Sequence, residues 1–156
     1  MEIRRLTFEH AARCAELEEL LFPGDNPWPR DIFVVEFAQP TNLYLGVFDG
    51  DDLLAYGGIS QLGPRDAPAI EIHTIGVDPE HRRRGLGRLL MDQFMQLADG
   101  LDGAVFLEVR TDNEAAVELY RAFDFEIIGE RRRYYQPSGA DAFTMKRASG
   151  SERRGV

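Results

Sequence analysis

The sequence predicts an α/β fold in which a single domain holds a mixed sheet with helices on both of its faces. Two patterns predict it. Apolar residues recur with a helical period up to about residue 37, and then with the period of two that strands show from Asn42 onward. In the second half, strand, helix and strand follow one another twice, and such crossovers lay helices against a sheet. The expected element order is β-α-α-β-β-β-α-β-α-β-β.

The N-terminal part is expected to form one strand and two helices. "EIRRL" (Glu2–Leu6) is typical of a short strand, and Thr7 can cap a helix that runs to about Leu21. "FPGDNPWPRD" ends that helix with three prolines and a glycine, and a second short helix follows from about Pro29 to Phe37. The first helix carries apolar residues at helical spacing: Ala11, Cys14, Leu17, Leu20 and Leu21.

The middle of the chain alternates like a sheet. "NLYLGVFDGDDLLAYGGISQL" predicts two strands with a turn at Asp49–Asp52, and "AIEIHTIGVD" predicts a third strand that ends before Pro79. A helix from about Arg84 to Ala98 is expected next. Its apolar side is formed by Leu86, Leu89, Leu90, Phe94 and Leu97.

The last third repeats strand and helix before a hairpin. "GAVFLEVR" is an apolar run that suits a strand buried on both faces. Asn113 is a good cap for a helix to about Phe123, and "FEIIGERRRYYQ" and "DAFTMKR" form a hairpin joined by "PSGA". The domain is expected to span residues 1–147, and the small, polar and charged tail 148–156 is expected to be disordered.

Composition narrows the possible partners. The formal net charge is −9, which argues against nucleic-acid binding and is compatible with a cationic substrate. We find no apolar run long enough for a membrane span and no signal-peptide core, and the single Cys14 fits a reducing cytoplasm. Histidine, cysteine and acidic residues show no metal-ligand spacing, so no metal is expected. The oligomeric state stays open between monomer and weak dimer.

One stretch, "GVDPEHRRRGLGRLL", combines a strand end, arginines, glycines and a helix start. Free N–H groups at a helix N-terminus favour an anion, and glycines let a phosphate approach the backbone at Gly85 and Gly87. Charge-assisted bonds can come from neighbouring arginines. These are Arg82, Arg83, Arg84 and Arg88. The stretch therefore predicts a polyphosphate site.

Two common phosphate motifs fail on named residues. A Walker loop needs a lysine that is absent here, and a dinucleotide fingerprint needs a glycine where Leu90 stands. The pattern that fits is R/Q-x-x-G-x-G/A, which here reads Arg82-Arg83-Arg84-Gly85-Leu86-Gly87. In this motif and in element order along nearly the whole chain, the sequence resembles the Gcn5-related N-acetyltransferases. The resemblance implies a mostly antiparallel seven-stranded sheet with about four helices, and a loop that binds the pyrophosphate of acetyl-CoA.

The segment "LEVRTDNEAAVELY" offers groups for acetyl transfer to an amine. The amine must lose a proton, the oxyanion needs hydrogen-bond donors, and the leaving thiolate benefits from a proton. Glu108 lies inside an apolar strand, where an unpaired carboxylate is costly and its pKa should rise. Tyr120 follows on the next helix, where it is either a proton donor or a core tyrosine with its hydroxyl at the edge.

The C-terminal third, from "LEVR" to "DAFTM", resembles the bacterial ribosomal-protein-alanine N-acetyltransferases, which act on small-subunit protein S18. The resemblance implies that Glu108 is the general base, Tyr120 the general acid and Asn113 a cofactor contact. It further implies that the backbone of Ile75, Gly76 and Val77 holds the acetyl and pantetheine groups. A splayed strand end there would free the N–H of Val77 for the oxyanion.

The resemblance also implies a peptide side of the cleft. The family's "RR-x-YY" segment falls on Arg131–Tyr135, so Tyr134 and Tyr135 are expected to contact the acceptor, together with Trp28. The alternatives are a charged hairpin edge for the tyrosines and a core anchor for Trp28. His73 is a substrate contact or a second candidate for the base, and alternation places it on one face with Glu71, Ile75 and Val77.

Three functions remain open from the sequence. The first is acetylation of a protein α-amine, an N-terminal alanine of a ribosomal protein. The second keeps the enzyme class and changes the acceptor to protein lysine, a polyamine or another small amine. The third is a non-catalytic CoA-binding module, which leaves the carboxylate within the strand unexplained. One departure from the family is Asp124, which stands where a glycine usually ends the helix.

Overall fold

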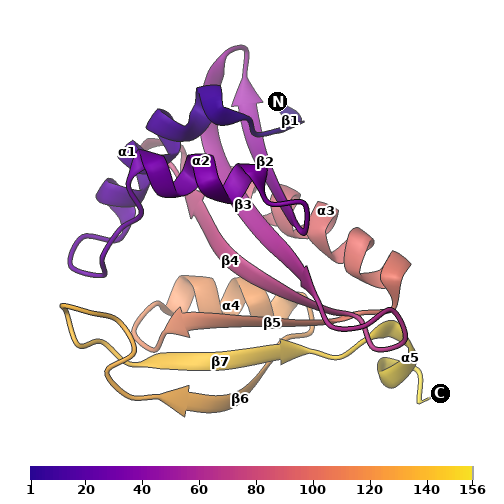
Figure 1. The fold of residues 1–156 in the computed structure, drawn as a ribbon. Helices are drawn as coiled ribbons and strands as arrows, with labels where there is room; N and C mark the ends of the chain where they lie inside the picture. Colours follow the sequence, from indigo (N-terminus) through magenta and orange to yellow (C-terminus); the bar gives the residue numbers. More distant parts are fainter. Residues whose placement is uncertain (156) are drawn as a thin grey trace.

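A computed structural model describes residues 1–155 and confirms the α/β class (Figure 1). Seven strands form one sheet in the order β1-β2-β3-β4-β5-β7-β6, in which β4 and β5 are parallel and the other neighbours antiparallel. The elements are β1 (Glu2–Arg5), α1 (Ala11–Leu21), α2 (Arg30–Ala38), β2 (Asn42–Asp49), β3 (Asp52–Leu62), β4 (Ala69–Val77), α3 (Leu86–Leu101), β5 (Ala104–Arg110), α4 (Glu114–Ala122), β6 (Glu126–Arg131), β7 (Ala142–Arg147) and α5 (Gly150–Arg153).

Helices cover both faces of the sheet, as predicted (Figure 1). On one face α1 and α2 pack against β2 and β3, with Phe33 and Tyr56 fully buried between them. On the other face α3 and α4 cover a larger core around Leu90 and Phe94. No helix in residues 1–155 is long and apolar enough to cross a membrane.

The two halves of the sheet separate at its centre. Pairing between β4 and β5 joins Ala69–Glu71 to Ala104–Phe106 and extends no further in the part of the chain that the structure describes. Beyond that point β4 stays with β3 and β5 stays with β7, so the two strands diverge (Figure 1). Residues that follow the paired part of each strand line the opening between β4 and β5. The split therefore places them together in the candidate site.

Some expected helix details are wrong. The first helix begins at Ala11, and Phe8–His10 before it form a separate 3₁₀ turn. Leu20, Leu89 and Leu97 were expected on the apolar stripes, yet 38–58% of their surface is exposed. A stripe of four or five residues is wider than the contact that a helix makes with a twisted sheet, so its outer members remain in solvent.

The strand "GAVFLEVR" is also not buried on both faces. In β5 buried and half-buried residues alternate, and Glu108 is on the half-buried side. The α4 helix covers one face of β5, whereas the other face borders the split in the sheet. Its apolar composition therefore reflects one packed face and one cavity wall.

The expected disorder of the tail 148–156 is wrong for helix α5. Ser149 and Glu152 form a reciprocal capping box, a signal that the sequence S-x-x-E carries. The Ser151 N–H and hydroxyl both donate to the Asp102 carboxylate at the end of α3, and Arg153 pairs with Asp99 at 3.0 Å. The folded body therefore continues past residue 147, and Val156 lies outside the described residues.

Candidate functional site

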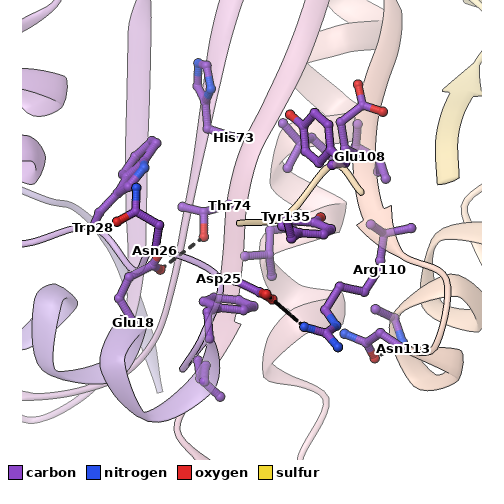
Figure 2. A pocket seen from close by; sticks show the side chains of 18 of the residues that line it. Glu18, Asp25, Asn26, Trp28, His73, Thr74, Glu108, Arg110, Asn113 and Tyr135 are labelled. Atoms are coloured by element: carbon purple, nitrogen blue, oxygen red, sulfur yellow. Dashed lines mark hydrogen bonds and ion pairs between the residues drawn. The ribbon is translucent and has the colours of Figure 1, made fainter. Parts of the chain in front are cut away.

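A cavity of about 600 Å³ opens where β4 and β5 diverge (Figure 2). Its walls come from the α1–α2 segment, β4, β5, α4 and the β6–β7 loop. Eight of the residues predicted from the sequence line it: Trp28, His73, Ile75, Glu108, Asn113, Tyr120, Tyr134 and Tyr135. Side chains far apart in the sequence therefore meet in one place.

Glu108 is half-buried on the β5 wall and paired, which corrects the expectation of an isolated buried carboxylate. The Thr144 hydroxyl on neighbouring β7 donates to its Oε2, and the Arg131 guanidinium lies 3.8 Å from the same oxygen. About a fifth of the side chain is exposed to solvent. These contacts hold the carboxylate in place at the cavity wall.

Tyr120 lies in the cavity floor with 7% of its surface exposed. Its ring packs against Phe125 with a centroid distance of 5.8 Å, so it belongs to the core as well as to the cavity. Burial raises its pKa to about 12, and the phenol is therefore protonated at neutral pH. Its hydroxyl makes no hydrogen bond with another residue in the range 1–155, which leaves the proton available to a ligand.

Aromatic side chains form the mouth of the cavity. Tyr134 and Tyr135 meet edge to face with ring centroids 5.0 Å apart, and the Arg131 guanidinium lies 5.5 Å from the Tyr134 ring. Burial raises the pKa of both phenols, and the charge of Glu108 adds to the rise at Tyr134. Trp28 was predicted either to contact the acceptor or to anchor the core. Its ring packs on Phe33 and also lines the cavity, so its position fits both.

His73 lies at an irregularity of β4 that sequence alternation did not reveal. Thr74 pairs with Gly58 and Ile72 pairs with Ile59, so His73 is an extra residue without a partner on β3. Such a bulge shifts the alternation by one. The expected common face is therefore wrong: Ile75 and Val77 pack on the α3 side with Ile72. Thr74, by contrast, reaches Glu18 on α1.

The backbone of β4 beyond the split presents free polar groups to the cavity. The Asp78 N–H donates to the Leu54 carbonyl, and directions alternate along an antiparallel pair. Gly76 therefore points its N–H toward β3, whereas Ile75 and Val77 point theirs away from β3 and toward the diverging β5. The predicted role of the Val77 N–H is compatible with this direction.

The glycine-arginine loop follows β4, and its residues lie outside the lining of this cavity. Gly85 caps α3 with a left-handed φ of 75°, and the first hydrogen bond within the helix runs from Leu89 N–H to its carbonyl. The N–H groups of Leu86, Gly87 and Arg88 are thus not used in the helix. All four arginines of the predicted set are exposed: Arg82, Arg83, Arg84 and Arg88.

Gly87 contributes differently from the expectation that it exposes the backbone. A Cβ at residue 87 would lie 3.4 Å from Leu119 and 3.8 Å from Val77, so this glycine faces protein. At Gly85 a Cβ would meet nothing within 4 Å, and its positive φ is what requires glycine there. Gly87 therefore brings α3 close to α4 and β4.

Asn113 caps α4, as predicted. Its Oδ1 accepts the Ala116 N–H at 3.2 Å, which fixes the side chain at the cavity edge and leaves its Nδ2 donors directed elsewhere. Among residues 1–155, no group of three or more His, Cys, Asp and Glu side chains is placed to hold a metal ion.

Glu18 also lines the cavity, although it was not predicted as a site residue. Its side chain is buried between α1 and the sheet, where Tyr56 and Thr74 donate hydrogen bonds to it. Burial raises the pKa of this carboxyl group despite the two donors. The signal was present, because a carboxylate at residue 18 interrupts the apolar stripe of Cys14, Leu17 and Leu21.

A second unrecognised group joins the two loops at the cavity mouth (Figure 2). Asp25, whose side chain is 4% exposed, accepts from Arg110 at 2.7 Å and from the Ser138 hydroxyl. The Ser138 N–H donates to the Gly24 carbonyl at 2.8 Å. Arg110 also pairs with Asp112 at 2.9 Å, and the two carboxylates raise its pKa. We call Asp25, Arg110 and Ser138 the loop clasp.

Comparison with known proteins shows the family. The model of the acetyltransferase (GNAT) family matches residues 11–125. The chain is 53% identical over 148 residues to N-alpha-acetyltransferase RimI of Mycobacterium tuberculosis, covering 95% of this chain and 92% of the relative. It is 37% identical to the ribosomal protein bS18-alanine N-acetyltransferase of Salmonella typhimurium, over 70% of this chain and 71% of that protein.

A solved structure agrees with the sequence relatives. The ribosomal-protein-S18-alanine N-acetyltransferase of Escherichia coli superposes with a TM-score of 0.76 at 26% identity, covering 94% of this chain and 92% of that one. The split sheet, the glycine-arginine loop and the cavity therefore belong to a fold that this chain shares with an S18-alanine N-acetyltransferase. The chain belongs to the GNAT family and is an acetyltransferase.

Proposed function

We propose that this protein transfers an acetyl group from acetyl-CoA to the α-amine of an N-terminal alanine, and that its acceptor is ribosomal protein S18. The names of the relatives support the acceptor, because those from Salmonella typhimurium and Escherichia coli act on this alanine. One observation carries the mechanism: Glu108 and Tyr120 line the same cavity, beside the part of β4 that is not paired with β5.

The residues present fit the cofactor that the family uses. The α3 N-terminus after Gly85 offers unused N–H groups and a favourable helix dipole for a pyrophosphate, with arginines at its rim. The N–H groups of Ile75 and Val77 face the split, where they can bind the pantetheine and acetyl oxygens. Asn113 borders the same space. Acetyl-CoA supplies the acetyl group as a thioester.

The side chains divide the proton transfers between two walls. Glu108 on β5 accepts the proton of the incoming ammonium, directly or through one water. Tyr120 on α4 holds its proton at neutral pH and donates toward the sulfur as the thiolate forms. The Val77 N–H donates to the oxygen that becomes negatively charged. No step requires a covalent bond to the protein.

The loop clasp supports a chain end as the acceptor. It joins the α1–α2 segment to the β6–β7 loop, and Trp28 and Tyr135 from these loops both line the cavity. A peptide terminus can enter between joined loops end first, with its amine leading. The overall negative charge of the protein favours the approach of a cationic terminus.

Acceptor peptides test the proposal. We expect release of CoA thiol with an Ala-initiated peptide whose lysines are acetylated, and no release when its α-amine is blocked and its lysines are free. Equal rates on the α-blocked peptide would assign the enzyme to protein lysine, and turnover of spermidine alone would assign it to small amines. Mass spectrometry of N-terminal peptides from cells with and without the protein identifies the acceptor itself.

A further inference from the structure

Helix α1 lies against the part of β4 that no longer pairs with β5. Beyond Glu71, β4 pairs with β3 on one edge, and within residues 1–155 no strand pairs with its other edge. The two faces of this segment meet different helices, because Ile75 and Val77 pack on the α3 side whereas Thr74 reaches Glu18 on α1. The segment is therefore held from both faces while one edge stays free.

An ion pair joins α1 to the end of β4. The Arg13 guanidinium donates to the Asp78 Oδ2 atom at 2.6 Å, and the Asp78 side chain is 11% exposed. The Asp78 Oδ1 atom accepts the Glu80 N–H at 3.0 Å, so Asp78 also caps the turn that leads to the glycine-arginine loop. Burial alone would raise the pKa of Asp78, but the Glu80 N–H and the Arg13 guanidinium lower this pKa below its usual value. The pair is thus ionised at neutral pH.

A second polar contact holds β4 four residues earlier. The Thr74 hydroxyl donates to the Glu18 Oε2 atom at 3.4 Å (Figure 2). The Tyr56 hydroxyl on β3 donates to the same oxygen. Glu18 is buried, so a single carboxyl group on α1 ties two neighbouring strands out of reach of bulk water.

Between these two contacts the helix touches the backbone of β4. A Cβ at residue 76 would lie 2.7 Å from the Leu21 side chain of α1 and 2.6 Å from the Tyr56 ring, so glycine is what permits this approach. Thr74, Gly76 and Asp78 are alternate residues, which share one face of a strand. The free segment of β4 thus presents one continuous face to α1.

We propose that Arg13 and Glu18 are positioning residues for acetyl transfer, because they fix the free edge of β4 from its α1 face. That edge carries the N–H groups of Ile75 and Val77, to which the proposed function assigns the acetyl and pantetheine oxygens. The proposal rests on that function and adds two residues of another element to it. Arg13 is not among the residues that line the cavity, so it acts through Asp78.

Amide hydrogen exchange measures the hold on β4 without turnover. Arg13→Met keeps the length of the side chain and removes the ion pair. Exchange at Gly76, whose N–H points toward β3, should become at least about tenfold faster, because the segment opens more easily. Amides of residues 69–71, which pair with strands on both edges, should change by no more than about twofold. Arg13→Lys keeps a charged donor and should restore most of the protection at Gly76.

Other variants separate this ion pair from its neighbours. Arg13 also pairs at 2.6 Å with Glu16, which is 64% exposed on the same helix. Glu16→Gln is the matched control, and exchange at Gly76 should stay within about twofold of wild type. Adding Arg13→Met to Asp78→Asn should change exchange little further, because the pair is already broken. Thr74→Val removes the second contact and should speed exchange at Gly76 at least about threefold.

Cofactor binding connects the hold on β4 to the reaction. Calorimetry with acetyl-CoA should give a Kd at least about fivefold higher in Arg13→Met and within about twofold of wild type in Glu16→Gln. KM for an Ala-initiated peptide should stay within about twofold in both variants, because the acceptor side of the cavity is unchanged. A purely structural pair would lower the melting temperature and leave the Kd of the folded protein unaltered.

Three results would overturn the assignment. One is unchanged exchange at Gly76 in Arg13→Met. Another is faster exchange throughout the sheet, residues 69–71 included, which would show a loss of global stability only. The third is unchanged acetyl-CoA affinity in a variant whose exchange at Gly76 has increased. Failure of the proposed function looks different, because the α-amine peptide would then not be turned over while exchange and acetyl-CoA binding still changed as described.

Discussion

Glu108 has two partners whose effects on catalysis differ. Thr144 orients the carboxylate through a hydrogen bond, and Arg131 provides positive charge 3.8 Å away. The exposed edge of the side chain allows a water or an amine to reach the carboxylate. Glu108 is thus held in place by its partners without being isolated in the core.

Removing the Glu108 charge should slow turnover without loosening the cofactor. General base catalysis contributes about 10² to 10⁴ in rate, so Glu108→Gln should lower kcat by at least about tenfold. The amide is nearly isosteric and can keep the hydrogen bond to Thr144. Steady-state kinetics and calorimetry with acetyl-CoA measure both quantities. Full kcat in a folded Glu108→Gln protein, with an inactive His73→Ala protein, would move the base to β4.

The Tyr120 hydroxyl should be needed for turnover and not for folding. Phe removes one oxygen from a ring that packs on Phe125, so the melting temperature of Tyr120→Phe should stay close to that of the wild type. We expect kcat to fall at least about tenfold, because the leaving thiolate loses its donor. Single-turnover rates give the chemical step. A wild-type rate in this variant would show that Tyr120 is a core residue only.

The two substitutions should not act independently. In the proposed mechanism Glu108 and Tyr120 act in one transition state, so the double variant should lose less than the product of the two single losses.

At the scale of elements, the end of α4 has an unusual residue in a common motif. Asp124 has a φ of 71°, and its N–H donates to the Arg121 carbonyl while the Phe125 N–H donates to the Tyr120 carbonyl. These two bonds form a Schellman motif, whose left-handed position glycine usually fills. Asp124 thus occupies the left-handed position at the helix end where the family usually has glycine.

Glycine at residue 124 should stabilise the protein. A residue with a Cβ is strained in the left-handed region, and an acidic group at a helix C-terminus opposes the helix dipole. Asp124→Gly should raise the free energy of unfolding by about 1 kcal/mol, which corresponds to about 2–4 °C in melting temperature. Asp124→Asn is the matched control, because it removes the charge and keeps the side-chain size. A gain as large in Asp124→Asn would assign the effect to the dipole alone.

Alanine substitution at the two glycines of the glycine-arginine loop should have different effects on acetyl-CoA binding. At Gly85 the φ of 75° strains any side chain, so Gly85→Ala should distort the α3 start and weaken acetyl-CoA binding about tenfold. At Gly87 an added Cβ meets Leu119 and Val77 at 3.4 and 3.8 Å, which is ordinary contact. Gly87→Ala should therefore bind acetyl-CoA within about threefold of wild type.

Calorimetry compares the two loop variants, and far-ultraviolet circular dichroism checks that both keep their helices. The same contrast explains why the motif R/Q-x-x-G-x-G/A admits alanine at its last position and not at its fourth. Equal affinities in the two variants would contradict the assigned role of the left-handed cap.

At the scale of the whole molecule, buried phenols connect stability to alkaline pH. Burial raises the pKa of all five tyrosines: Tyr44, Tyr56, Tyr120, Tyr134 and Tyr135. A phenol titrates near pH 10 in the unfolded chain and later in the folded one. The stability that the raised pKa provides is therefore complete below pH 10 and is lost as the pH rises through the folded value.

The stability of the protein should fall steeply above pH 10. For Tyr120, whose pKa is about 12, the loss reaches about 2–3 kcal/mol once the pH exceeds that value. Urea unfolding at pH 8 and pH 11 measures it. Tyr120→Phe should show a fall smaller by about 1 kcal/mol between these two values, because one titrating group is gone. An identical fall in wild type and variant would contradict the assignment to Tyr120.

The sheet as a whole creates the site by failing to pair at its centre. One half, β1 to β4, is held by α1, α2 and α3, and the other half, β5 to β7, carries α4 (Figure 1). On the α3 and α4 side a single core spans both halves, from Ala55 on β3 to Met145 on β7, and it holds the halves together where β4 and β5 diverge. The divergence leaves backbone groups of β4 free for a ligand. The loop clasp joins the halves again at the cavity mouth.

The sequence by itself determined the fold class, the element order and eight of the residues that line the cavity. The spacing of apolar residues, the helix-capping residues and the glycines are signals that depend only on nearby residues. Asn113 at a helix start and Gly85 in a loop could therefore be identified from the sequence around them. The position of Asp124 at a helix end could be read in the same way, but its left-handed φ could not be fixed from the sequence, because some helices end in an extended residue, as α2 does at Gln39.

Only the tertiary structure decided which side chains face each other. The bulge at His73 depends on the register with β3, and it reversed the face expected for Ile75 and Val77. Glu18 became a cavity residue because Tyr56 and Thr74, distant in sequence, supply its hydrogen bonds. Pairing, burial and charge compensation arise between segments far apart in the chain, so the bulge at His73 shows only in the pairing with β3.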